Sequence, residues 1–328
     1  MLRKLCVLSS LFLTFTLVSQ AQDSRHFTFH YAFTVKNLPA GKKVRVWIPA
    51  AQSDAYQEVR TVSAKGDLPV KKTRESRFGN EVYFAETNSA TQPELHFEVE
   101  YDVARRERVA LNSAAHVIPA SLSSTERKED LQPDALVPVT GLPADLAAKV
   151  TQGKTLPLDK ARAIYDYVFT TMKYDKTGTG WGHGDVLYAC DAKKGNCTDF
   201  HSLFIAMARS QGIPARFEIG FPLPPDKHSA EIAGYHCWSD FYIDGKGWIP
   251  VDISEAWKHP DKHDYFFGSH DVNRVQFSMG RDLRLNPAQD GKPLNYFVYP
   301  YVEVDGQEYS NVSLAFSFSD VAPAVAAK

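Results

Sequence analysis

The sequence predicts an α+β protein with an amino-terminal β-sandwich, a domain in which a buried helix packs on an antiparallel sheet, and a strand-rich carboxy-terminal tail. Residues 26–103 alternate apolar and polar side chains with a period of two, as half-buried strands do. Residues 157–173 and 197–208 instead place apolar side chains three and four positions apart, as amphipathic helices do. Residues 215–252 return to strands, so a helix precedes an antiparallel sheet in this part of the chain.

Residues 1–21 have the organisation of a secretory signal peptide. Two basic residues near the start are followed by an apolar run over 5–18 and a small-x-small cleavage site at 19–21. The apolar run is too short and too rich in Ser and Thr to span a bilayer as a stable helix. We therefore expect an exported protein, periplasmic or secreted, that begins near Gln22 and has no stable membrane insertion after the signal is removed.

The charge balance gives no reason to expect a nucleic acid as a partner. Of 328 residues, 37 are Lys or Arg, 39 are Asp or Glu, and 44% are hydrophobic. Without the two basic residues of the predicted signal, 35 positive side chains face 39 negative ones, a net charge near −4. This composition is typical of a globular protein and argues against a strongly basic chain that binds nucleic acid or an anionic membrane.

The alternating pattern within residues 22–104 predicts a small antiparallel β-sandwich. Its first strand shows the alternation in five apolar side chains: Phe27, Phe29, Tyr31, Phe33 and Val35. Turn sequences at 38–41 and 78–80 separate the strands. Residues 105–142 are charged, Ser-rich and interrupted by prolines, and because both signs of charge are mixed we interpret them as a solvated connector.

A helix-rich domain over 143–275 follows the connector. Residues 143–150 predict a short helix and residues 157–173 a stronger one with five apolar positions: Leu158, Ala161, Tyr165, Val168 and Met172. The loop over 174–185 contains four glycines, but their spacing matches neither the dinucleotide fingerprint nor the P-loop. A glycine-rich loop just before the next helix fits better as one wall of an active-site groove.

Cys197 stands at the first turn of that next helix. Asn196 is a good N-cap, and Asp199 places a carboxylate near the positive end of the helix dipole. A thiol at this position faces free backbone N–H groups, which stabilise the thiolate over the thiol. The pattern therefore indicates a nucleophile.

Three cysteines remain after the predicted signal peptide: Cys190, Cys197 and Cys237. An odd number in an oxidising compartment leaves at least one thiol unpaired, which is a reason to look for a reactive one. A disulfide between Cys190 and Cys237 is compatible with the sequence, which does not establish it.

His236 and Asp252 supply a base and a carboxylate on two neighbouring strands that flank the turn at 244–247. A register that pairs Tyr242 with Lys246 would put His236 directly across from Asp252, within hydrogen-bonding reach. A thiol at neutral pH needs such partners because it is mostly protonated. The imidazole takes its proton, and the carboxylate orients the imidazole and stabilises its charged form.

Together these residues resemble the transglutaminase-like superfamily, cysteine enzymes with a papain-type core. The similarity rests on four short motifs: Gly-Asn-Cys-Thr-Asp at 195–199, Gly-Ile-Pro-Ala-Arg at 212–216, His-Cys-Trp at 236–238 and Pro-Val-Asp at 250–252. It extends over roughly 158–252, and the flanking parts look like secreted bacterial members with a β-sandwich before the core. The resemblance implies that Cys197 is the nucleophile, His236 the general base and Asp252 its orienter.

The resemblance also implies a reaction on an amide carbonyl. Attack by the thiol gives a thioester acyl-enzyme, which water resolves by hydrolysis or an amine resolves by cross-linking. We expect hydrolysis of a peptide or protein, since the sequence shows neither a calcium-binding constellation nor the additional domains of the animal cross-linking enzymes. The Cys197 N–H is the natural first oxyanion donor. Further candidates are Tyr174 and Trp181 for a side-chain oxyanion donor, and Trp238 and His183 for the substrate groove.

Three other interpretations stay open. A buried cysteine is often a small core side chain. A metal site would gather Cys190, Cys197, His201, His236 and Cys237. Against it, neighbours on a strand point to opposite faces, and no Cys-x-x-Cys pair is present, so we expect no metal and no cofactor. The fold could also serve as a non-catalytic binding or scaffold protein.

Residues 276–328 form the strand-rich tail, with a strong Asp-Gly hairpin turn at 305–306. The alternating side chains after this turn must cover an apolar face, either of the catalytic sheet or of the amino-terminal sandwich. The sequence leaves that choice open, and it does not reveal the oligomeric state.

Overall fold

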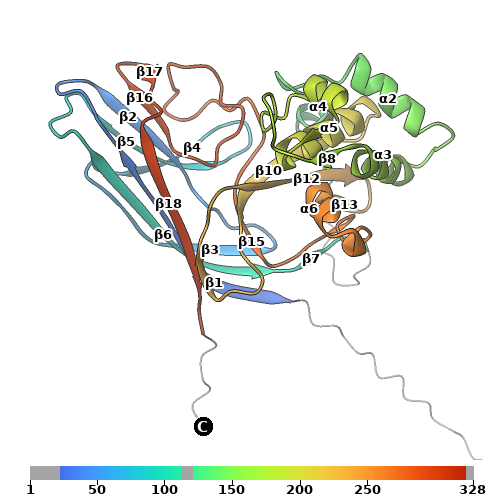
Figure 1. Cartoon of the computed structure of the whole chain (residues 1–328), viewed down its shortest axis with the longest axis horizontal. Coiled ribbons are helices and arrows are strands. Elements are labelled where there is room, and N and C mark those ends of the chain that lie inside the picture. Colours follow the sequence, from blue (N-terminus) through green and yellow to red (C-terminus); the bar gives the residue numbers. More distant parts are fainter. Residues whose placement is uncertain (1–22, 112–120, 323–328) are drawn as a thin grey trace, which may run out of the picture.

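The computed structural model describes residues 23–111 and 121–322, so the predicted signal peptide lies outside the described residues. Figure 1 shows two lobes side by side, a sandwich lobe made of strands and a helical lobe in which helices cover a sheet. The architecture is α+β, as predicted. None of the helices in the described ranges is long and apolar enough to cross a membrane.

Two five-stranded antiparallel sheets make up the sandwich lobe, in the orders β11-β18-β1-β6-β3 and β17-β16-β2-β5-β4. The first sheet contains β1 (Ser24–Val35), β3 (Gln57–Gly66), β6 (Leu95–Arg106), β11 (Ser229–Glu231) and β18 (Val312–Asp320). The second contains β2 (Val44–Pro49), β4 (Lys71–Arg74), β5 (Glu81–Thr87), β16 (Tyr301–Val304) and β17 (Gln307–Glu308).

The carboxy-terminal strands dock on the amino-terminal sandwich, which decides the choice that the sequence left open. β18 pairs with β1 without interruption, from Phe27 opposite Asp320 to Val35 opposite Val312. β16 pairs with β2 in the other sheet. Each sheet of the sandwich therefore combines strands from both ends of the described chain.

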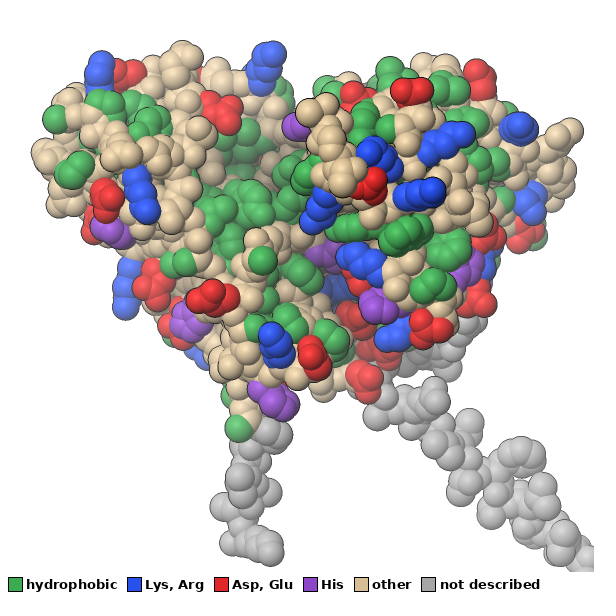
Figure 2. Space-filling model, in the orientation of Figure 1, with side chains coloured by type: hydrophobic (Ala, Val, Ile, Leu, Met, Phe, Trp, Pro, Cys, Tyr) green, Lys and Arg blue, Asp and Glu red, His purple; other side chains and the backbone are tan. Residues whose placement is uncertain are grey.

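One hydrophobic core runs through both lobes. The alternation of β1 buries Tyr31, whose ring centroid lies 4.7 Å from that of Phe316 and 5.5 Å from that of Phe277. Phe316 belongs to the sandwich and Phe277 to the sheet of the helical lobe, so the lobes share packed side chains rather than a flexible linker. On the face shown in Figure 2, hydrophobic side chains also gather where the two lobes meet.

The helical lobe contains a four-stranded antiparallel sheet in the order β13-β12-β10-β15. Its strands are β10 (Ala215–Pro222), β12 (His236–Ile243), β13 (Gly247–Val251) and β15 (Arg274–Met279). Two further sheets have two short strands each. One pairs β7 (Arg108–Val109) with β14 (Ser269–His270), and the other pairs β8 (Lys173–Tyr174) with β9 (Lys194–Gly195).

The sheet is covered by helices of which one is almost wholly buried. The helices are α1 (Ser124–Glu129), α2 (Leu142–Val150), α3 (Pro157–Thr171), α4 (Val186–Ala192), α5 (Cys197–Ser210), α6 (Ile253–Lys258) and the 3₁₀ turn η1 (Pro260–Lys262). Every residue of α5 before Ser210 is buried, because the helix lies between β10 and β12 on one side and α2, α3 and α4 on the other. The predicted buried helix on an antiparallel sheet is thus confirmed.

The register of the β12–β13 hairpin differs from the prediction. Tyr242 pairs with Trp248 rather than Lys246, and Ile243 pairs with Gly247. The turn closes one residue later than expected, since the Lys246 N–H donates to the Ile243 carbonyl at 3.0 Å. Asp252 consequently lies just beyond the end of β13, where it becomes the N-cap of α6 instead of a cross-strand partner.

Candidate active site

Cys197 is the first residue of α5, and its helix start is closed by a capping box. The Asn196 side chain accepts a hydrogen bond from the Thr198 N–H at 2.9 Å, and the Asp199 carboxylate accepts one from the Asn196 N–H, also at 2.9 Å. In the described part of the chain, no hydrogen bond of the Cys197 N–H is recorded. That N–H therefore stays free to act on a group beside the sulfur.

Asp199 also fixes the glycine-rich loop against the start of α5. Its carboxylate accepts hydrogen bonds from the Gly182 N–H at 2.7 Å and from the Gly184 N–H at 3.0 Å. The carboxylate lies so close to Gly195 that a Cβ built there would be 2.1 Å from its Oδ2, so only glycine fits. The loop is thereby held beside Cys197, where the sequence predicted a groove wall.

His236 and Asp252 form a buried pair, with 2.7 Å between Nε2 and Oδ2. The other carboxylate oxygen of Asp252 caps α6 by accepting the Glu255 N–H at 3.1 Å. Arg274, itself buried, donates to Oδ2 at 2.9 Å. Because Asp252 holds Nε2 of His236, the opposite ring nitrogen, Nδ1, is left for the thiol.

Electrostatics in this site favour ionised groups. Burial alone would raise the pKa of the Asp252 carboxyl, but His236 and Arg274 hold it well below its usual value. Burial alone would lower the pKa of His236, yet the Asp252 carboxylate and the Cys197 sulfur raise it to about 10. The Cys197 thiol, in turn, has a pKa well below its usual value although burial opposes this, because hydrogen bonds from Cys237 and His236 favour the thiolate. These directions favour a thiolate–imidazolium pair over a neutral thiol and imidazole.

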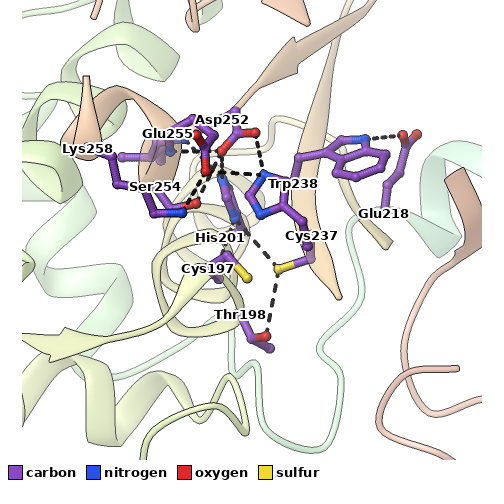
Figure 3. Close-up of polar contacts among 12 residues, drawn as sticks. Cys197, Thr198, His201, Glu218, Cys237, Trp238, Asp252, Ser254, Glu255 and Lys258 are labelled. Atoms are coloured by element: carbon purple, nitrogen blue, oxygen red, sulfur yellow. Dashed lines mark hydrogen bonds and ion pairs between the residues drawn. The ribbon is translucent and has the colours of Figure 1, made fainter. Parts of the chain in front are cut away.

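A second sulfur, that of Cys237, lies near Cys197, although the sequence grouped the two only in the metal-site alternative. Cys237 was expected to point away from His236 and hence from the site. Its Sγ instead lies 3.7 Å from the Thr198 hydroxyl and 3.9 Å from Nδ1 of His201, and Figure 3 shows it directed toward the start of α5. The expectation failed because His236, the first residue of β12, reaches past the end of the strand to Asp252, so both neighbours border the site.

Two of the predicted accessory residues are engaged elsewhere. Trp238 is fully buried and donates its indole N–H to Glu218 at 2.7 Å, so it supports the sheet and does not line a groove (Figure 3). Trp181 donates its indole N–H to the Gly178 carbonyl at 3.1 Å, which occupies the donor proposed for an oxyanion. His183 is exposed on the glycine-rich loop. Tyr174 is half-buried with its ring beside Phe200, and it remains a prediction as a donor.

Tyr235 is a polar residue of the site that sequence reasoning missed. Its hydroxyl accepts a hydrogen bond from the Asn196 side chain at 3.0 Å and lies 2.9 Å from the Thr198 hydroxyl. These two partners flank Cys197 in the sequence, so the tyrosine hydroxyl is brought to the start of α5. Its position just before His236 was the only available signal.

An open cavity of about 470 Å³ lies against His236. Its lining combines prolines from the end of β10 and the loop after it with two charged residues: it includes Pro222, Pro224, Pro225, Gly234, Glu255 and Arg274. The cavity gives small molecules and water access to the histidine side of the site.

The described residues contain no group of three or more His, Cys, Asp or Glu side chains arranged to hold a metal ion. Cys190, Cys197 and Cys237 are all free thiols, so the structure contains no Cys190–Cys237 disulfide.

Comparisons with known proteins agree with this fold. Residues 144–253 match the model of the transglutaminase-like superfamily. The chain is 28% identical over 316 residues to an uncharacterized protein of Haemophilus influenzae, covering 85% of each, and 26% identical over 129 residues to YebA of Bacillus subtilis, covering 35% of this chain and 18% of that protein. A solved structure of a candidate cysteine protease from Cytophaga hutchinsonii superposes over 92% of each chain with a TM-score of 0.58 at 16% identity, a likeness of fold.

The fold of this region is that of a transglutaminase-like core. Residues 144–253, the part of the chain that matches the transglutaminase-like superfamily, whose members are typically cysteine enzymes, are joined to a β-sandwich completed by the carboxy-terminal strands.

Proposed function

We propose that this protein is an exported cysteine hydrolase that cleaves an amide bond in a peptide or protein through a thioester on Cys197. The observation that carries the proposal is the juxtaposition of a thiol at the start of α5 with the buried His236–Asp252 pair. Export rests on the signal-like residues 1–21. The candidate protease from Cytophaga hutchinsonii, which shares the fold, adds plausibility to hydrolysis.

The proposed reaction begins with attack of the Cys197 thiolate on the carbonyl carbon, which forms a C–S bond and turns the carbonyl oxygen into an oxyanion. The Cys197 N–H and the Tyr235 hydroxyl are the donors that we assign to that oxyanion. Protonated His236 then gives its Nδ1 proton to the leaving nitrogen as the C–N bond breaks, leaving a thioester.

Deacylation uses the same histidine in the opposite sense. Neutral His236 takes a proton from water entering through the cavity beside it, and the resulting attack releases a carboxylic acid and restores the thiolate. Asp252 keeps the ring oriented in both steps and stabilises its positive charge. An amine arriving by the same route would give transfer instead of hydrolysis, which is the competing activity.

Alkylation of Cys197 by iodoacetamide is expected to proceed well below pH 8.5, the region where an ordinary thiol titrates. Replacing His236 with alanine removes the proton acceptor and one of the two hydrogen bonds that favour the thiolate, so the midpoint of the rate–pH curve should rise toward about 8.5. Cys190 provides an internal control, because burial raises the pKa of its thiol to about 11. Mass spectrometry of the labelled peptides reads both thiols in one sample. A wild-type Cys197 midpoint near 8.5 that His236→Ala leaves unchanged would favour a non-catalytic scaffold.

The oxyanion role of Tyr235 predicts different effects on two reactions of Cys197. Tyr235→Phe should slow acylation by p-nitrophenyl acetate about 10- to 100-fold, because acylation passes through an oxyanion. Alkylation by iodoacetamide has no oxyanion and should change little. Tyr299→Phe, which removes a hydroxyl that contacts the Tyr235 N–H at 3.3 Å, is the matched control. Equal losses in both reactions would mean that Tyr235 only supports the helix start.

The acyl-enzyme made with p-nitrophenyl acetate also separates hydrolysis from transfer. We expect it to turn over in buffer alone with release of acetate. If turnover occurs only after a primary amine is added, and acetate is recovered as the amide, the protein is an acyltransferase.

A further inference from the structure

His201 lies one helical turn after Cys197 and is completely buried. Both ring nitrogens have backbone partners. Nδ1 is 2.8 Å from the Cys197 carbonyl oxygen, and Nε2 is 3.0 Å from the Ile253 backbone nitrogen. The residue therefore spans two segments of the site that are far apart in the sequence.

The partners define the protonation of this ring. The Ile253 N–H can only donate, so Nε2 must accept and the ring proton must sit on Nδ1, where it donates to the Cys197 carbonyl. Burial, moreover, lowers the pKa of His201 and favours the neutral form. His201 is thus a neutral imidazole whose Nδ1–H donates one hydrogen bond and whose Nε2 accepts another.

The two backbone partners of His201 lie next to the groups that do the proposed chemistry. Cys197 carries the nucleophile at the start of α5, and Ile253 directly follows Asp252 at the start of α6. Nε2 of His201 is 3.7 Å from Oδ1 of Asp252. Since Asp252 holds His236, a shift of α6 relative to α5 would move the imidazole relative to the sulfur.

We infer that His201 is a positioning residue that sets the distance between the Cys197 thiol and the His236–Asp252 pair by tying the first turn of α5 to the first residue of α6. The inference rests on the proposed function, in which these three residues act together. The link to Ile253 is the one that joins the two helices, so the acceptor at Nε2 matters more than the donor at Nδ1.

Three variants separate the two bonds. His201→Gln can place a carbonyl oxygen near the position of Nε2 and keep the acceptor for Ile253. His201→Asn can place an amide N–H near the position of Nδ1 and keep only the donor to Cys197. His201→Phe keeps much of the ring volume and loses both. Met207→Ala, a large-to-small change at a fully buried position of the same helix, is the control for lost stability alone.

The readouts are the pH midpoint of Cys197 alkylation and the rate of acylation by p-nitrophenyl acetate, measured on the full-length protein. His201→Phe should raise the midpoint by about one pH unit and slow acylation about 10- to 100-fold. His201→Gln should recover most of both effects, and His201→Asn little. Met207→Ala should leave the midpoint where it is in the wild type.

The inference is overturned if His201→Phe keeps the wild-type midpoint and acylation rate, if His201→Asn recovers more than His201→Gln, or if Met207→Ala moves the midpoint as far as His201→Phe does. Should His201→Phe not fold, the order of His201→Gln and His201→Asn decides the question. An ordinary midpoint in the wild type would instead refute the proposed function, so the two failures are distinguishable.

Discussion

Replacing Asp252 with asparagine is expected to slow acylation of Cys197 by p-nitrophenyl acetate about 10³- to 10⁴-fold, the scale seen when a triad carboxylate is neutralised. The amide keeps the size of the side chain and an oxygen to accept the Glu255 N–H, so α6 stays capped. It loses the charge that raises the pKa of His236 to about 10. The imidazolium is then no longer stabilised, and the thiolate loses its counter-ion.

Glu255→Gln is the matched control for charge alone. Its carboxylate is 4.0 Å from Nε2 of His236 and pairs with Lys258 at 2.6 Å, so it contributes a negative charge without holding the ring. We expect less than a tenfold change in acylation for this variant. Similar losses in Asp252→Asn and Glu255→Gln would contradict the assignment of Asp252 as the orienter.

The same carboxylate makes stability depend on pH. Asp252→Ala leaves Arg274 buried without this partner and should lower the free energy of unfolding by about 3–5 kcal/mol. The Asp252 pKa is depressed in the folded state, so its contribution is present above the usual pKa of 3.8 and is lost as the pH falls further. The raised pKa of His236 contributes fully below 6.5 and is lost as the pH rises to about 10.

The stability difference between wild type and Asp252→Ala should therefore be largest between about pH 4 and 6.5 and shrink toward pH 10. Urea denaturation of both proteins at pH 5.5 and pH 9.5 measures it. A difference that is constant or grows with pH would show that the His236–Asp252 pair is not charged in the folded protein.

Local patterns in the sequence were sufficient to predict those parts of the fold that depend only on residues close together along the chain. The period of two in β1 shows which face is buried, and Asn196 marks the start of α5, because alternation and capping are short-range properties. The same patterns do not specify which strands pair with one another in a sheet. The side chains of β18 alternate in a way that would fit either sheet, and only tertiary packing shows that β18 pairs with β1.

The site was predictable to the same extent. His236 and Asp252 could be paired from the hairpin, yet the contact arises differently, since a shift of two in the register turns Asp252 into a helix cap. His201 and Arg274 carry no periodic or motif signal, because each reaches the site from a position set by packing between elements distant in sequence. Residues such as these, which hold the predicted site residues in place, can be identified only from the three-dimensional structure.

Replacing Asp199 with alanine is expected to destabilise the protein by at least about 3 kcal/mol, because three backbone N–H groups would lose their acceptor at about 1–3 kcal/mol each. These belong to Gly182, Gly184 and Asn196, and all three bonds are buried. Asp185→Ala is the matched control. Asp185 also caps a helix, by accepting the Leu187 N–H at 2.9 Å, but this bond is at the surface and its loss should cost about 1 kcal/mol.

The larger loss should be accompanied by a local change that Asp185→Ala does not produce. Hydrogen exchange at the amides of Gly182 and Gly184 should accelerate in Asp199→Ala beyond what the lower global stability explains, since Asp199 alone is recorded as their acceptor among the described residues. The freed loop would no longer be held beside Cys197, and acylation should fall while the pH midpoint of alkylation, set by His236 and Cys237, changes little. Protection of both glycine amides at the wild-type level would mean that the loop is held by other contacts, and the carboxylate would then serve the helix start alone.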